Sequence, residues 1–202
     1  LPREVKEGGH IEALKGTVVN LEAQATKPVV EGKLILNQRD QLPLEVEGEQ
    51  LKGNLLVFYS GTYSLSIRDE LGFENSNPVQ YRIHLILDQY PEVEILSPTE
   101  DREISGDEVL PVLYAARDDF GLTGIRLIYQ KTGTERSISL RNPGNSPTAG
   151  PELFKWDLAS LSLTPGDRVD YRLEARDNDS LSGPKSGYSK TFTLRMRDLK
   201  GR

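Results

Sequence analysis

The chain has 202 residues, with 25 basic and 31 acidic side chains, two histidines and no cysteine. The absence of cysteine excludes disulfides and thiolate metal sites. The net charge of −6 argues against a nucleic-acid-binding protein, which would carry a basic surface. The longest apolar run, residues 55–59, is far shorter than the ~20 residues of a membrane-spanning helix. We therefore expect no nucleic-acid partner and no membrane insertion by this segment.

The sequence opens Leu-Pro-Arg, without an initiator methionine and without a signal peptide. We expect it to be a piece of a longer protein, with any anchor or targeting signal encoded elsewhere. Its partner would be another protein or other parts of its own longer chain.

The first half of the chain reads as a series of strands. Residues 1–15 are a polar lead-in with part of a first strand. From Val19 to Ala25 apolar and polar residues alternate, which is typical of a strand with one buried face. Similar patterns predict the following strands: 33–37, 41–47, 54–59, 63–68 and 81–88.

The second half repeats this pattern after a short linker, residues 88–91. Alternation places Trp156 in the core. Residues 141–151 hold three prolines and two glycines, so we expect a mobile loop there, either presented to a partner or a plain connection. The predicted strands are 93–96, 112–117, 125–130, 137–140, 154–158, 171–177 and 190–198.

A duplicated segment defines the architecture. Residues 61–69 read GTYSLSIRD and residues 166–177 read GDRVDYRLEARD, so in both a tyrosine opens an alternating strand that ends in Arg-Asp. Each is followed by a polar turn and a second alternating strand. Repeated units of this kind predict an all-β chain with two tandem Ig-like (fibronectin-III-like) sandwiches. We place them at residues 1–90 and 91–202, joined by the short linker.

Several strings resemble known families. The string LTPGDRVDYRLEA (163–175) is similar to the fibronectin type III and Ig-like pattern that feeds a tyrosine corner. That resemblance implies a hydrogen bond from the Tyr171 phenol to upstream backbone, worth about 1 kcal/mol. The residues GTY (61–63) are a shorter version of the same pattern.

Two further strings resemble an uncharacterised family of large bacterial envelope proteins, in which Ig-like repeats follow N-terminal membrane helices. They are ARDDFGL (116–122) with IRLIY (125–129), and ARDND (175–179) with SGPKSG (182–187). The resemblance implies a periplasmic or extracytoplasmic setting in the cell envelope. It implies no known activity and no catalytic residue.

Five aspartates are candidate metal ligands. In an Ig-like sandwich the entering chain and two loops between the sheets lie at the same pole, which predicts a group that we call the acidic cluster: Asp88, Asp118, Asp119, Asp177 and Asp179. Glu100, Asp101 and Glu103 are further candidates to approach it. Calcium takes six to eight oxygen ligands, and carboxylates that converge between modules can supply them. The cluster therefore predicts a possible calcium ion at the junction of the two sandwiches.

The alternative is that these aspartates cap turns through the backbone and pair with arginines such as Arg68, Arg102, Arg117 and Arg176. Exposed pairs of this kind contribute roughly 0–1 kcal/mol each. Sequence alone leaves both interpretations open.

Enzymatic interpretations have little support. Neither His10 nor His84 lies in a pattern that would position an imidazole for a triad or a zinc site. Lys131-Thr-Gly133 and Ser182-x-x-Lys185 match letters of penicillin-binding proteins, but Gly183-Pro184 cannot begin the helix that Ser-x-x-Lys requires. We predict no enzyme and no obligate cofactor.

The leading hypothesis is a non-enzymatic extracytoplasmic spacer or protein-interaction module of a larger envelope protein. The alternative is a calcium-stabilised adhesion or carbohydrate-recognition module. Its aromatic candidates for a sugar are Phe73, Tyr90, Phe120 and Tyr188.

Overall fold

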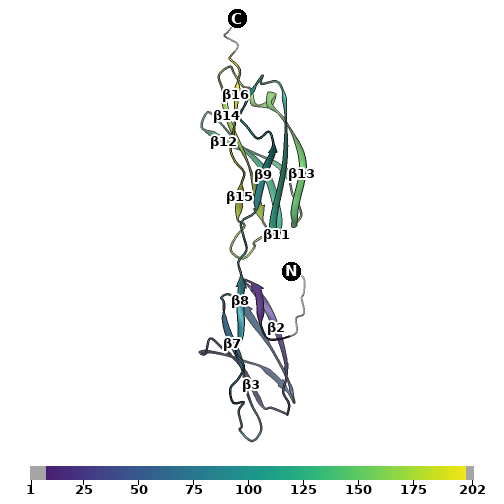
Figure 1. Ribbon diagram of the computed structural model, residues 1–202, viewed down its shortest axis with the longest axis vertical. Coiled ribbons are helices and arrows are strands. Elements are labelled where there is room, and N and C mark those ends of the chain that lie inside the picture. The colour runs from purple at the N-terminus through teal and green to yellow at the C-terminus, as the bar shows by residue number, and fades with distance from the viewer. Residues whose placement is uncertain (1–7, 199–202) are drawn as a thin grey trace. The chain divides into compact units, whose positions relative to one another are not determined.

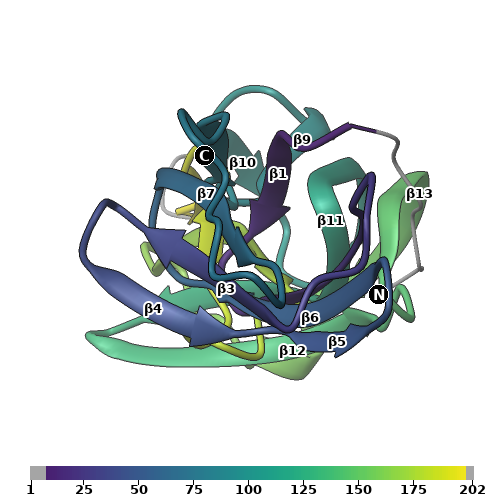
Figure 2. The same ribbon diagram turned by 90° about the horizontal axis from the view of Figure 1, so that it is seen from below.

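The computed structural model describes residues 8–198, which form strands and one short 3-10 helix (Figures 1 and 2). The chain divides into two compact units, the first ending at Leu87 and the second beginning at Asp88. Within residues 8–198, no helix has the length and apolarity needed to cross a membrane.

The first unit is a sandwich of two sheets. One sheet has the order β1-β8-β7-β3-β4 and the other β2-β6-β5. Figure 2 shows β5 beside β6 and β3 beside β4. The strands are β1 (Ile11–Leu14), β2 (Thr17–Gln24), β3 (Glu31–Leu36), β4 (Asp40–Pro43), β5 (Glu45–Glu47), β6 (Gln50–Val57), β7 (Gly61–Arg68) and β8 (Tyr81–Ile86).

The second unit repeats the larger sheet with the order β10-β16-β14-β11-β12. In both units the first strand of this order pairs in parallel with the last strand of the unit. The elements are β9 (Glu92–Ser97), β10 (Arg102–Ile104), β11 (Val109–Lys131), β12 (Thr134–Arg141), β13 (Ser146–Asp157), the 3-10 helix η1 (Leu158–Leu161), β14 (Arg168–Asp177), β15 (Ser186–Tyr188) and β16 (Phe192–Met196).

Strand β11 belongs to both layers of the second unit. Its first half pairs with β9 and β13, and its second half pairs with β12 and β14. The register shifts between Arg117 and Leu122, where the strand passes from one layer to the other. The sequence predicts two separate strands here, because residues 118–121 interrupt the alternation.

Each unit has its own apolar core. In the second unit Trp156 is buried, as the alternation predicts, and its ring packs against Tyr129 and Tyr171. In the first unit Leu34, Leu55 and Val57 lie at the centre. Burial of alternating apolar residues from both sheets is what holds such a sandwich together.

The expected mobile loop at 141–151 is largely a strand. Ser146 to Pro151 lie in β13, and the register pairs Ala149 with Ala116 and Thr148 with Arg117. Strand β13 pairs with β11 alone, and an edge strand of this kind tolerates prolines that would break a central strand. The prediction of a loop was therefore wrong over these residues.

The two tyrosines of the duplicated segment differ in their hydroxyl partners. Tyr63 donates a hydrogen bond to the carbonyl of Gly9. The Tyr171 hydroxyl is buried and has no hydrogen-bond partner among the described residues. The predicted corner bond at Tyr171 is therefore wrong. Burial raises the pKa of both phenols to about 12, so both are neutral at physiological pH.

We expect Tyr63→Phe and Tyr171→Phe to have different effects on stability. Tyr63→Phe should lower the free energy of unfolding of the first unit by about 1 kcal/mol, because it removes a hydrogen bond and leaves the Gly9 carbonyl without it. Tyr171→Phe should leave the second unit as stable as before or slightly more stable, since it removes an unpaired buried hydroxyl. Denaturant unfolding of both variants measures this, and a loss of 1 kcal/mol or more in Tyr171→Phe would contradict it.

Candidate functional site

The bend of β11 positions Asp118 and Asp119 of the acidic cluster. Asp118 Oδ2 accepts hydrogen bonds from the backbone N–H groups of Phe120 (3.0 Å) and Gly121 (2.7 Å). Gly121 has φ +139°, and a Cβ there would lie 2.5 Å from the Asn145 carbonyl oxygen. The turn therefore requires glycine at 121, and the turn fixes the Asp118 carboxylate.

The end of β14 and the loop that follows it position Asp177 and Asp179. Asp177 is fully buried, and its Oδ1 accepts from the N–H groups of Asp179 (3.1 Å) and Lys185 (2.8 Å). Asp179 Oδ1 accepts from the N–H groups of Leu181 and Ser182. These two carboxylates organise the loop between β14 and β15 through its backbone.

Lys185 lies among three of the aspartates. Its ammonium hydrogen bonds to Asp88, lies 3.3 Å from Asp179 Oδ2, and lies 2.8 Å from Asp177 Oδ2 as an ion pair without hydrogen-bond geometry. The lysine side chain is 18% exposed. Burial lowers the pKa of Lys185, but the bonds and charges of Asp177 and Asp88 outweigh it and raise that pKa above its ordinary value. Lys185 is therefore a fixed internal cation.

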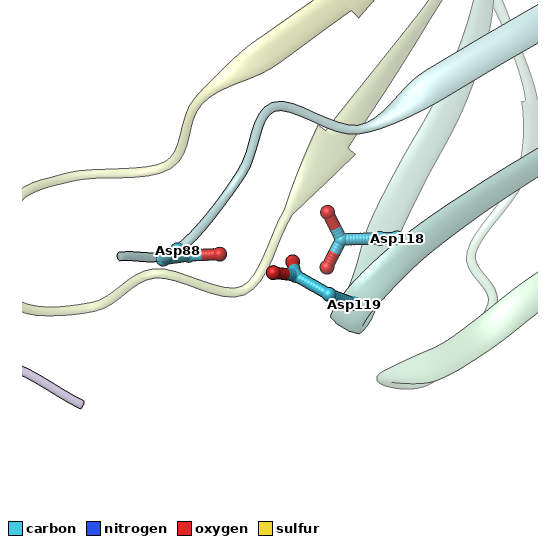
Figure 3. Close-up of side chains that lie close together, drawn as sticks. All are labelled: Asp88, Asp118 and Asp119. Atoms are coloured by element: carbon cyan, nitrogen blue, oxygen red, sulfur yellow. The ribbon is translucent and has the colours of Figure 1, made fainter. Parts of the chain in front are cut away.

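A second group within the acidic cluster consists of Asp88, Asp118 and Asp119. One carboxylate oxygen from each of Asp88, Asp118 and Asp119 lies within 4.8 Å of the others. Figure 3 shows the three carboxylates turned toward one another. Asp119 Oδ2 also accepts from the N–H of Gln89 at 3.3 Å. Burial raises the pKa of Asp88 despite the neighbouring Lys185 ammonium.

The five predicted aspartates thus form two groups that share Asp88, and all five belong to the second unit. The further candidates lie elsewhere: Asp101 accepts from the N–H of Thr193, and Glu103 lies 3.9 Å from Arg197. Oxygen ligands for a cation are therefore offered by Asp88, Asp118 and Asp119, whereas Asp177 and Asp179 face Lys185.

The alternative interpretation is confirmed in one part and wrong in another. The aspartates do cap turns through the backbone. Within residues 8–198, however, Arg68 pairs with Glu31 and Arg117 with Glu92, each on a neighbouring strand. Arginine and aspartate that follow one another in a strand project to opposite faces, so these two arginines meet a glutamate across the sheet instead.

Three Arg-Asp dipeptides share one structural role. Asp69, Asp118 and Asp177 are all buried, and each accepts a hydrogen bond from the N–H two residues further on. The remaining oxygen of Asp69 accepts a hydrogen bond from Lys27 in the first unit, and that of Asp177 forms an ion pair with Lys185 in the second. Asp118 differs, because its Oδ1 is buried and has no partner among the described residues.

Lys185 is the residue that sequence reasoning missed. It lies in the Ser182-x-x-Lys185 string, which matches a catalytic motif by its letters alone. A usable signal was present: a lone lysine follows two aspartates, Asp177 and Asp179, in the loop after a strand, with Pro184 before it. A buried aspartate requires a donor or a cation, and this lysine is within reach in sequence of Asp177 and Asp179.

The histidines lie outside any catalytic arrangement. His84 is exposed on β8, and His10 Nδ1 accepts the N–H of Arg82. A hollow of about 490 Å³ in the first unit includes Glu22 and Glu45, but both stand opposite Lys52 in strand register. This is a row of cross-strand charge pairs. These two histidines and two glutamates therefore give no support for a catalytic group.

Among known proteins, only solved structures show a similarity to this chain. No family model matches the sequence, and no curated protein matches it. The fibronectin(III)-like modules of Clostridium thermocellum CbhA match 97% of this chain and 95% of that chain at 14% identity, with a TM-score of 0.35. A chimeric titin Z1Z2 tandem matches 93% and 95% at 16% identity (TM-score 0.31), and DIP-gamma IG1+IG2 matches 96% and 97% at 11% identity (TM-score 0.30). The predicted all-β chain of Ig-like and fibronectin-III-like sandwiches is confirmed by the strand orders of the two units.

Lys185→Met should destabilise the second unit by about 2–4 kcal/mol, because it leaves the buried Asp177 without a counter-charge while keeping an apolar stem of similar length. Trp156, the single tryptophan, is buried in this unit, so its fluorescence reports the unfolding.

The matched control is Lys27→Met in the first unit. Lys27 also bonds a buried aspartate, Asp69, but it is 61% exposed. Its loss should cost at most about 1 kcal/mol by far-ultraviolet circular dichroism. Equal losses in the two variants would contradict the special role of Lys185.

Proposed function

We propose that the chain is a non-enzymatic spacer and protein-interaction module of a larger extracytoplasmic envelope protein. The setting follows from the resemblance of residues 116–122 and 175–179 to bacterial envelope proteins. Both units are all-β sandwiches, and loops and edge strands on such scaffolds commonly serve recognition. The partner is another protein or another part of the same longer chain.

The fastening of the connector carries the proposal. Strand β8 ends at Ile86, and two residues later Asp88 is held by Lys185. The N–H of Gln89 then bonds Asp119. Pro91 packs tightly on Gly187, where a Cβ would fall 1.6 Å from the proline carbonyl oxygen. The connector is therefore part of the folded second unit.

A fastened connector suits a spacer. A free polar linker behaves as a flexible coil, whose ends sample many separations. Residues bound by ion pairs and hydrogen bonds have lost that freedom, and the segment from Asp88 to Pro91 has contacts of both kinds. This supports a module that holds its neighbours at a defined spacing.

Two of the four aromatic candidates for a sugar, Phe73 and Tyr188, already contact cations within the chain. The Tyr188 ring is covered by the Arg172 guanidinium at 4.6 Å, and its hydroxyl bonds Glu174. The Phe73 ring lies 5.9 Å from the Lys27 ammonium. These rings already have partners within the chain, whereas a sugar platform needs an open aromatic face.

Distance measurements between spin labels test the spacer. Because the chain has no cysteine, Tyr90→Cys in the connector and Thr134→Cys in β12, both at exposed positions, place two labels in the second unit. The proposal predicts a single narrow distribution of distances. Lys185→Gln, in a preparation whose Trp156 fluorescence confirms a folded second unit, should broaden it. A broad distribution in the chain with native Lys185 would contradict the spacer.

A further inference from the structure

Three buried aspartates that follow an arginine, Asp69, Asp118 and Asp177, differ in the partner of one carboxylate oxygen. In each, one oxygen accepts backbone N–H groups. A lysine ammonium lies against the other oxygen of Asp69 and of Asp177. Asp118 is also buried, at 9% exposed, but its second oxygen has no protein donor within residues 8–198. By comparison with Asp69 and Asp177, we expect a positive charge beside the second oxygen of Asp118.

Two neighbours of Asp118 supply more negative charge. Asp119 and Asp88 each bring an oxygen within 4.8 Å of it, and Figure 3 shows their carboxylates turned toward it. Asp88 Oδ1 is also buried and without a partner among the described residues. Lys185 contacts Asp88 through the other oxygen, Oδ2. Two orphaned carboxylate oxygens therefore lie in one acidic group.

The geometry fits a hard cation. Two oxygens that bind one calcium ion at ~2.3–2.6 Å can stand up to about 5 Å apart, and the three oxygens here lie within 4.8 Å of one another. Carboxylates are the ligands that calcium prefers, with carbonyls and water completing six to eight positions. Zinc, by contrast, favours histidine and cysteine ligands, which these three residues do not provide.

We infer that Asp88, Asp118 and Asp119 form a divalent-cation site in the second unit, with calcium as its preferred ion. The bound ion takes the place at Asp118 that Lys27 and Lys185 take at the other two buried aspartates of this kind, Asp69 and Asp177. It also links the connector at Asp88 to the bend of β11. The site goes beyond the spacer proposal, which holds with or without a metal.

The test is thermal unfolding of the whole 202-residue chain, followed by Trp156 fluorescence after EDTA treatment and during titration with calcium chloride. Calcium at ~100 times its dissociation constant should raise the midpoint of the second unit by ~10 °C. Magnesium chloride at equal ionic strength should give a smaller shift. No calcium shift would overturn the inference and show that solvent hydrates the Asp118 oxygen.

Variants separate a built site from diffuse negative charge. Asp119→Asn is the main variant, because Asp119 is exposed and its loss leaves the turn at Gly121 intact; it should weaken calcium binding tenfold or more. Asp179→Asn is the matched control, because it removes the same charge from the acidic cluster but not from the three-carboxylate group of Asp88, Asp118 and Asp119. It should change the calcium affinity less than threefold. Equal weakening in both variants would overturn the site.

Discussion

The second unit depends on a single constraint: a carboxylate buried at the end of a strand must find a partner for each oxygen. Asp177 has no exposed surface, and its position at the end of β14 is fixed by the sheet. Leaving such a charge unpaired would cost several kcal/mol. The loop after β14 folds so that its own backbone and Lys185 meet that requirement.

This requirement connects local structure to function. The ammonium that neutralises Asp177 also holds Asp88, so the loop and the connector are fastened by one side chain. Asp69 is likewise bonded by a lysine, but Lys27 is exposed and the contact holds only a surface turn. The Arg-Asp strand ends of β7 and β14 therefore differ in their effect because Lys27 is exposed and Lys185 is not.

Much of the fold follows from alternation in the sequence. Strands such as β7 and β14 are predicted because one face is apolar throughout, and Trp156 is placed in the core for the same reason. Strand β13 escapes prediction over Ser146–Pro151, since its prolines stand on an edge where no second partner needs their N–H. Strands β10 and β15, of three residues each, exist through pairing with longer neighbours.

The candidate site is predicted less completely. Topology brings Asp118 and Asp119 toward Asp88, as the Ig-like arrangement of loops implies. The division of the five aspartates by Lys185 depends on where one flexible side chain comes to rest, which alternation does not encode. The same holds for the Tyr171 hydroxyl, because an orphaned polar atom is a property of packing and not of pattern.

A map of backbone amide chemical shifts in the ¹⁵N-labelled chain during calcium titration would locate the bound ion. A cation held by Asp88, Asp118 and Asp119 should produce saturable shifts at the amides that bond these carboxylates, those of Gln89, Phe120 and Gly121. The amides of Leu71 and Phe73, which bond the lysine-paired Asp69, should stay in place. Shifts spread evenly over acidic residues, or no shifts at all, would contradict the claim that Asp118 requires an added cation.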